Sequence, residues 1–115
     1  MSIMIRQWDV VKVKINPGRD LDSHPAVILS ADEICADERH LRLNVLFGTK
    51  KPPAAAKRSY GVLLNGADGL DFIAEVDCGF VHVISKEKIT AAAGRVTPVR
   101  QRELMRKRME CWRSR

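Results

Sequence analysis

Hydrophobic and polar residues alternate over short stretches of the chain, and turn residues separate these stretches. Over residues 9–15, three β-branched side chains fall on one face and two lysines on the other, which is typical of a half-buried β-strand. Residues 25–29 are apolar throughout, which predicts a short strand buried on both faces. The same patterns predict four more strands, over residues 41–47, 60–64, 72–76 and 80–84.

The segments between these strands are short and rich in turn formers. Asn16-Pro17-Gly18 ends the first strand, and Asn65-Gly66 and Asp68-Gly69 are turn dipeptides. Residues 30–40 are polar and acidic, and we expect a loop there with a short helical turn. Parallel strands would need intervening helices, for which these segments have no room, so the sheet should be mostly antiparallel.

The last segment has a helical period instead. Thr97 is a good N-cap, and Pro98 suits the first helical position. Four apolar side chains then recur at helical spacing: Leu104, Met105, Met109 and Trp112. They predict one helix over residues 98–112, with an apolar stripe that lies on the barrel or on a partner. The whole pattern predicts a mainly β, antiparallel barrel over residues 8–93 and a terminal helix, in a single domain of residues 1–115.

The composition fits this architecture. The chain has 115 residues, of which 45% are hydrophobic and 5% aromatic, so one aliphatic core is expected. No apolar run approaches the roughly 18 residues that cross a bilayer, so we expect a soluble, cytoplasmic protein with no membrane partner. Cys35, Cys78 and Cys111 have no metal-ligand spacing, and we expect reduced thiols and neither a metal nor a cofactor. The length and motifs also exclude a P-loop ATPase, a zinc finger and a large dinucleotide-binding enzyme.

The charge is uneven along the chain. The formal net charge is +6, and residues 95–115 carry all of the excess, with eight basic residues against Glu103 and Glu110. A basic tail on a neutral domain indicates a polyanion or an acidic protein as partner, although a solvated helix face explains it equally well. The basic candidates for nucleic-acid binding are Lys50, Lys51, Lys57 and Arg58 in a loop, and Arg102, Arg106 and Lys107 in the tail.

Several motifs occur in a characteristic order along the chain. They are Asp9-Val10-Val11, His24-Pro25-Ala26-Val27-Ile28-Leu29-Ser30, Phe47-Gly48-Thr49, Ala74-Glu75-Val76-Asp77, the segment from Val81 to Ile89, and Gly94-Arg95-Val96-Thr97-Pro98. Their order and spacing over residues 8–112 resemble the MazF/PemK/Kid toxins of bacterial type II toxin–antitoxin pairs.

This resemblance implies an SH3-like, antiparallel β-barrel with a C-terminal α-helix, which works as a homodimer. It also implies a growth-inhibiting mRNA interferase, which is a metal-independent endoribonuclease that cuts single-stranded RNA. A cognate antitoxin with an acidic tail would fill the RNA groove. The expected dimer contacts lie on the terminal helix, at Met105, Met109 and Trp112.

The candidate catalytic residues depart from the family pattern. Thr49 matches a family Thr or Ser, and Asp77 matches an Asp. His24 stands where the family usually has an arginine. Glu75 stands where some members of the family have a second arginine. His82 lies in the next strand segment, which a further arginine often precedes in the family. The chain therefore lacks the usual arginines and has two histidines instead.

Metal-free RNA cleavage needs a base for the 2′-hydroxyl, an acid for the 5′-oxygen and a donor for the charged phosphorane. His24 or His82 would be the base or acid, because an imidazole titrates near pH ~6.5. Thr49 would donate a hydrogen bond to the phosphate, and Asp77 would orient a histidine or the 2′-hydroxyl. The loop lysines would supply positive charge.

Two other functions stay open at this stage. One is a non-catalytic SH3-like barrel that binds nucleic acid or a protein partner, which the missing arginines favour. The other is a gyrase-directed toxin that resembles CcdB, which ends in a Trp-containing segment, as Trp112 suggests here.

Overall fold

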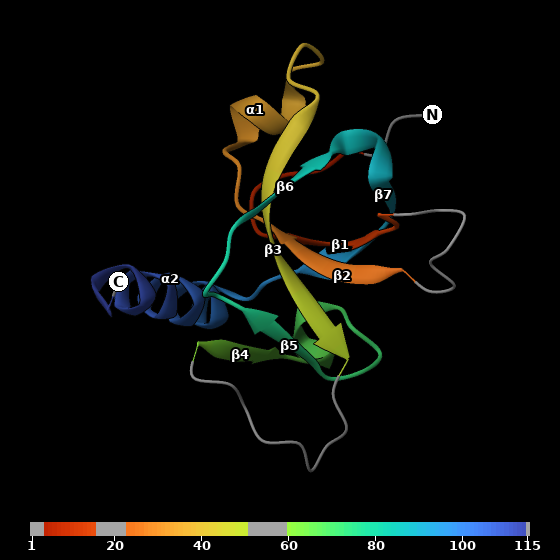
Figure 1. Cartoon of the computed structure of the whole chain (residues 1–115). Coiled ribbons are helices and arrows are strands. Elements are labelled where there is room, and N and C mark those ends of the chain that lie inside the picture. Colours follow the sequence, from red (N-terminus) through yellow and green to blue (C-terminus); the bar gives the residue numbers. More distant parts are fainter. Residues whose placement is uncertain (1–3, 16–22, 51–59, 115) are drawn as a thin grey trace.

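The computed structural model describes residues 4–15, 23–50 and 60–114, and these residues form seven β-strands and two α-helices (Figure 1). The strands are β1 (Asp9–Val13), β2 (His24–Ile28), β3 (Arg42–Lys50), β4 (Gly61–Leu64), β5 (Ala74–Asp77), β6 (His82–Ser85) and β7 (Ile89–Arg95). The helices are α1 (Asp32–Ala36) and α2 (Pro98–Ser114). Two short 3₁₀ turns, Gly66–Asp68 and Lys86–Lys88, complete the described structure.

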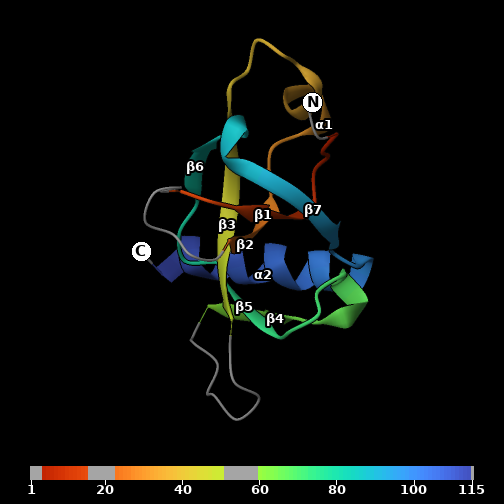
Figure 2. The same cartoon turned by 90° about the vertical axis from the view of Figure 1, so that its right-hand side faces the viewer.

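The strands pair in the order β4-β5-β3-β2-β1-β7, and β6 pairs with the first half of β3. Each of these pairings is antiparallel. The long β3 connects the parts of the sheet, because its last three residues pair with β5 and its middle pairs with β2. Figure 2 shows α2 below β1 and β2, where it crosses the long β3 and lies next to β4 and β5. The predicted mainly β, antiparallel architecture with a C-terminal helix is confirmed.

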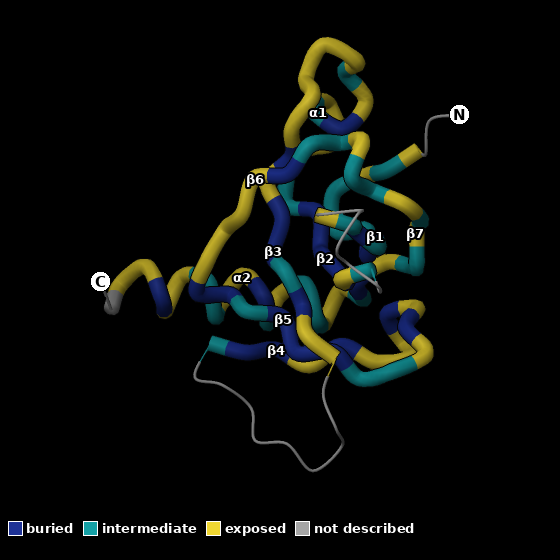
Figure 3. Tube along the Cα trace, turned by 45° about the vertical axis from the view of Figure 1, so that its right-hand side comes forward, coloured by how far each residue is buried: buried dark blue, intermediate teal, exposed yellow. Residues whose placement is uncertain are grey.

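Strands β1, β2 and β3 lie between two hydrophobic cores. Val10, Val27 and Leu46 face one core, which also holds residues of β4 and β5 and Leu104 of α2. The residues next to them in sequence, Val11, Ala26 and Val45, face the second core. Cys35 of α1 and Ile84 of β6 help to close this core. Because side chains alternate along a strand, a strand between two cores has no polar face. Residues 25–28 of the apolar run are therefore buried, as predicted, and Leu29 is half-buried against the first core (Figure 3).

Helix α2 begins at the predicted residue and ends two residues beyond the prediction. The backbone N–H of Arg100 donates to the Thr97 hydroxyl at 3.4 Å, which is the expected N-cap. The carboxylate of Asp68 also accepts from the Thr97 N–H at 3.1 Å, and so ties the helix start to the turn between β4 and β5. Helices in the described part of the chain lack the combination of length and apolar character that a membrane span requires.

Two strands differ from the prediction by more than a shift of one or two residues at their ends. The third strand was expected to end at Phe47 but continues to Lys50, because pairing with β5 holds its last residues extended. Strand β7 was not predicted, since small residues dominate its sequence and it shows no alternation of apolar and polar side chains. The glycine at position 94 has a packing reason: a Cβ added there would lie 2.5 Å from the carbonyl oxygen of Asp68, so the strand leaves no room for a side chain at this position.

Candidate active site

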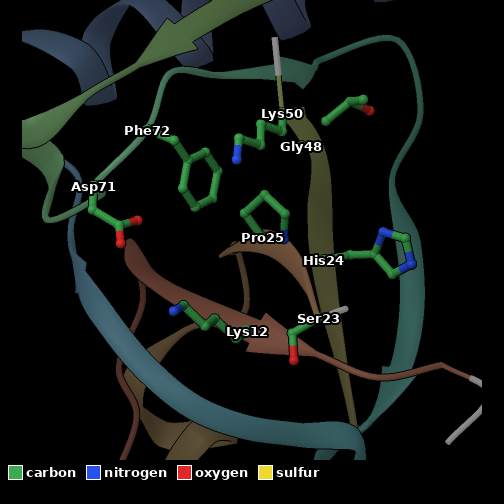
Figure 4. A pocket seen from close by; sticks show the side chains of 9 residues that line it. Lys12, Ser23, His24, Pro25, Gly48, Lys50, Asp71 and Phe72 are labelled. Atoms are coloured by element: carbon green, nitrogen blue, oxygen red, sulfur yellow. The ribbon is translucent and has the colours of Figure 1, made fainter. Parts of the chain in front are cut away.

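A pocket of about 600 Å³ opens where the ends of β1, β2 and β3 meet the segment that leads into β5 (Figure 4). Its lining residues come from these four segments: Lys12, Ser23, His24, Pro25, Gly48, Thr49, Lys50, Asp71 and Phe72. These residues are far apart in sequence. They meet because antiparallel pairing places the end of one strand beside the start of the next.

The inner surface of the pocket is apolar. Pro25 pairs with Lys12 across β1 and β2, and a Cβ added at Gly48 would lie 3.3 Å from Cγ of Pro25. The glycine therefore lets β3 approach the proline ring closely. Phe72 faces the same space in Figure 4. A substrate group that enters the pocket would therefore contact a hydrophobic floor.

Charged side chains surround this apolar floor of the pocket. The ammonium group of Lys50 lies 5.5 Å from the centre of the Phe72 ring, within the range of a cation–π interaction. Lys12 approaches from β1, and Asp71 stands on the other side of Phe72 (Figure 4). Two ammonium groups against one carboxylate leave the described rim positive, which suits a phosphate group.

His24 borders the pocket from the opposite side of the strand. It pairs with Val13, so its side chain lies on the face of β2 opposite to that of Pro25 and Lys12. In Figure 4 the imidazole points away from Lys50 and Phe72. The ring is exposed, so it is accessible to a substrate that passes over this end of the sheet.

Of the predicted site residues, His24, Thr49 and Lys50 thus lie at one pocket. The sequence analysis missed Lys12, Ser23, Asp71 and Phe72. Lys12 was assigned to the solvent face of a strand, and Phe72 to a strand of its own. A polar residue within two positions of the start of a predicted strand was the signal that could have found Ser23 and Asp71.

Asp77 and His82 are not among the residues that line the pocket. One carboxylate oxygen of Asp77 accepts a hydrogen bond from the Gly79 N–H at 2.7 Å, which is a local turn contact. His82 pairs with Val45, four residues before Thr49 on β3, which corresponds to about 13 Å along the strand. The catalytic roles of both residues stay predictions.

Lys51, Lys57 and Arg58 lie outside the described residues. On α2, Arg102 and Arg106 are exposed, and Lys107 pairs with Glu110 at 3.8 Å. None of these three lines the pocket. Other tail cations have structural contacts: Arg108, for example, donates to the Cys78 carbonyl at 2.9 Å.

The apolar stripe of α2 is divided between the core and the surface. Leu104 and Cys111 are buried, whereas three other side chains are 54–72% exposed: Met105, Met109 and Trp112. Among the described residues, no three His, Cys, Asp or Glu side chains gather closely enough to hold a metal ion.

No protein-family model and no curated protein matches the chain. Solved structures of similar fold do exist. One is an endoribonuclease in complex with its cognate antitoxin from mycobacterial species, with a TM-score of 0.72 and 13% identity over 95% of this chain and 93% of that one. Another is the Mycobacterium tuberculosis toxin MazF-mt6, with a TM-score of 0.71 and 14% identity over 91% and 96%. A third is a MazE–MazF structure from Deinococcus radiodurans, with a TM-score of 0.74 and 12% identity over 96% and 97%.

These likenesses extend over almost the full length of both chains. They place this chain in the fold of the MazF toxins and confirm the SH3-like barrel that the resemblance implied. At 12–14% identity they concern the fold alone.

Proposed function

We propose that this chain, which has the fold of the MazF toxins, is the toxin of a type II toxin–antitoxin pair. It acts in the cytoplasm as an mRNA interferase that cuts single-stranded RNA without a metal ion. The observation that carries this proposal is the pocket itself, which is lined by His24 at the start of β2, by Thr49 and Lys50 at the end of β3, and by Lys12 of β1. Known MazF-fold structures include an endoribonuclease with its antitoxin, and they support the same activity.

The pocket residues can divide the chemistry between them. His24, as the base, takes the proton from the 2′-hydroxyl, whose oxygen then bonds to phosphorus while the bond from phosphorus to the 5′-oxygen breaks. Thr49 donates to a non-bridging oxygen, and Lys12 and Lys50 stabilise the added negative charge. The 5′-oxygen takes up a proton from His82, the second histidine predicted from the sequence, or from water as it leaves, and the products are a 2′,3′-cyclic phosphate and a 5′-hydroxyl.

The exposed side chains of Met105, Met109 and Trp112 support a homodimer. A stripe of this kind on a small domain is typical of a subunit contact. We propose that a second copy covers it. The acidic tail of an antitoxin would compete with RNA for the cations at the pocket rim and for Arg102 and Arg106.

The experiment is a single-turnover cleavage assay with mixed-sequence RNA in EDTA, from pH 5 to 9. Removal of a positioned acid or base costs roughly 10²- to 10⁴-fold, so His24→Ala should lower the rate at least about 100-fold. Thr49→Ala should cost less, because it removes one hydrogen bond of about 1–3 kcal/mol. The predicted role of His82 in the second proton transfer is tested in the same way.

His40 provides the matched control. It is an exposed histidine, 4.0 Å from Asp37, and His40→Ala should cleave at the wild-type rate. Circular dichroism on each variant checks the fold. If His24→Ala cleaves like the wild type, the assignment of the base is wrong. If the wild type binds RNA but cleaves nothing between pH 5 and 9, the protein is a non-catalytic binding barrel.

A further inference from the structure

The pocket contains two side chains that the cleavage chemistry does not use, Asp71 and Phe72. We infer that they make the pocket a specificity site for one nucleobase of the RNA, and that this base is guanine. Phe72 packs against the base, and Asp71 accepts hydrogen bonds from its Watson–Crick edge. The inference rests on the proposed function, because it takes single-stranded RNA as the ligand.

The two faces of the sheet separate this site from the reacting groups. Lys12 pairs with Pro25, and a Cβ added at Gly48 would contact the Pro25 ring, so these three residues share one face. His24 and Thr49 are next to Pro25 and Gly48 in sequence, so their side chains lie on the other face. Both still border the pocket, because it opens at the strand ends. An RNA strand that presents a phosphate there can therefore place an adjoining base in the pocket.

The floor of the pocket fits a flat ring. Phe72 is half-buried and packs against the first core. Leu70 and Ala74, two residues before and after it, are buried in that core and hold the ring in place. The pocket volume of about 600 Å³ lies within the range of roughly 300–1,000 Å³ that is usual for small organic ligands. A single phosphate group would leave most of this space empty, whereas a nucleobase can pack its face against Phe72.

The carboxylate of Asp71 indicates a neutral donor as its partner. Asp71 is exposed, and in Figure 4 its carboxylate points towards the space between the Phe72 ring and the Lys12 side chain. A carboxylate beside a phosphate is unfavourable, because the two negative charges repel each other. A pocket for phosphate alone therefore does not account for this residue. The N–H groups of a neutral base can donate to it without this repulsion.

Guanine is the base whose edge suits a carboxylate. Its Watson–Crick edge carries two adjacent donors, N1–H and the 2-amino group, and a carboxylate can accept from both at once. Adenine and cytosine each place one amino group beside a ring nitrogen that is an acceptor, and uracil places its one N–H between two carbonyl oxygens. An acceptor opposite a carboxylate oxygen repels it and leaves it without a donor. Asp71 therefore favours guanine over the other three bases.

The test is a binding titration by fluorescence anisotropy, with short, labelled oligouridines that differ only in one central base. Their 2′-hydroxyls are replaced by hydrogen, so that they cannot be cleaved. A good bidentate contact discriminates against a wrong base by roughly 5- to 150-fold, and the wild type should prefer the guanine strand to the uracil strand within this range. Hypoxanthine, which lacks the 2-amino group of guanine, should lose part of the preference. Phe72→Leu should weaken binding of the guanine strand roughly 5- to 100-fold, because a stacked ring is lost.

Asp71→Asn separates base reading from electrostatics. It removes a negative charge, which by itself would strengthen the binding of every strand, and it replaces one acceptor oxygen by a donor. It should nevertheless bind the guanine strand more weakly than the wild type does, and bind the guanine and hypoxanthine strands equally. Glu33 is an exposed carboxylate on α1 that does not line the pocket. Glu33→Gln makes the same change of charge and should keep the wild-type preference.

The outcomes distinguish the guanine site from the proposed function. A wild type that binds all strands equally or prefers another base overturns the site while the proposed function stands. So does an unchanged guanine preference in Asp71→Asn. A wild type that prefers guanine but cleaves no mixed-sequence RNA supports the site and overturns the cleavage. A wild type that binds none of the strands overturns both.

Discussion

The buried carboxylate of Asp68 holds the start of α2 against the barrel, and its removal should be severe. Asp68 is fully buried. Its two oxygens accept from the N–H groups of Asn65 and Thr97, each at 3.1 Å, and one lies 3.8 Å from Nε of Arg100. Asp68→Ala removes these acceptors. It leaves two backbone donors without a partner, and it leaves Glu103 as the remaining carboxylate beside Arg100.

The magnitude follows from these contacts. Each of the two hydrogen bonds to the charged carboxylate contributes about 1.5–3 kcal/mol, and the contact with the partly exposed Arg100 adds less than about 1 kcal/mol. Because these contributions overlap at one carboxylate, we expect Asp68→Ala to lower the free energy of unfolding by about 3–5 kcal/mol. A small domain has only about 5–15 kcal/mol in total, so the Tm should fall by more than about 10 °C.

Urea and thermal unfolding, followed by circular dichroism, measure this loss. Asp68→Asn should lose less than Asp68→Ala, because its amide keeps one oxygen acceptor in place. Glu87 is exposed in the turn after β6, and Glu87→Gln should change the free energy of unfolding by less than about 0.5 kcal/mol. A loss below about 1 kcal/mol for Asp68→Ala would refute the idea that this carboxylate anchors the helix.

Three further predictions concern other parts of the molecule. Lys50→Gln should weaken RNA binding and flatten its salt dependence, as measured by titration at several salt concentrations, because one phosphate contact is lost. Met109→Glu should raise the monomer fraction in sedimentation, because a subunit contact would bury the new charge; a wild type that is monomeric at high micromolar concentration would contradict the dimer. Burial raises the pKa of the Cys78 thiol from 9.0 to about 12. Native protein should therefore resist iodoacetamide at this site at pH 8, and the contribution of this neutral thiol to stability should be lost as the pH rises from 9 towards 12.

The sequence alone was sufficient for most of the secondary structure. Alternation predicted β1, the apolar run predicted a strand buried on both faces at β2, and the cap at Thr97 predicted the start of α2. These signals are local, because side-chain periodicity and capping depend on residues a few positions apart. Strand β7 was missed for the same reason: its small residues show no alternation of apolar and polar side chains, and the glycine at position 94 is explained only by the close approach of the turn at Asp68.

The site depended much more on the tertiary structure. His24, Thr49 and Lys50 were predicted from their residue types and from the family resemblance, but Lys12 and Phe72 became recognisable only where the strand ends meet. The sequence suggested His24 and His82 as an equivalent pair. Pairing in the sheet instead leaves His24 at the pocket and sets His82 against Phe47. The register of strands far apart in sequence decides which side chains share a surface, and the local pattern of a single strand carries no information about its register with a distant one.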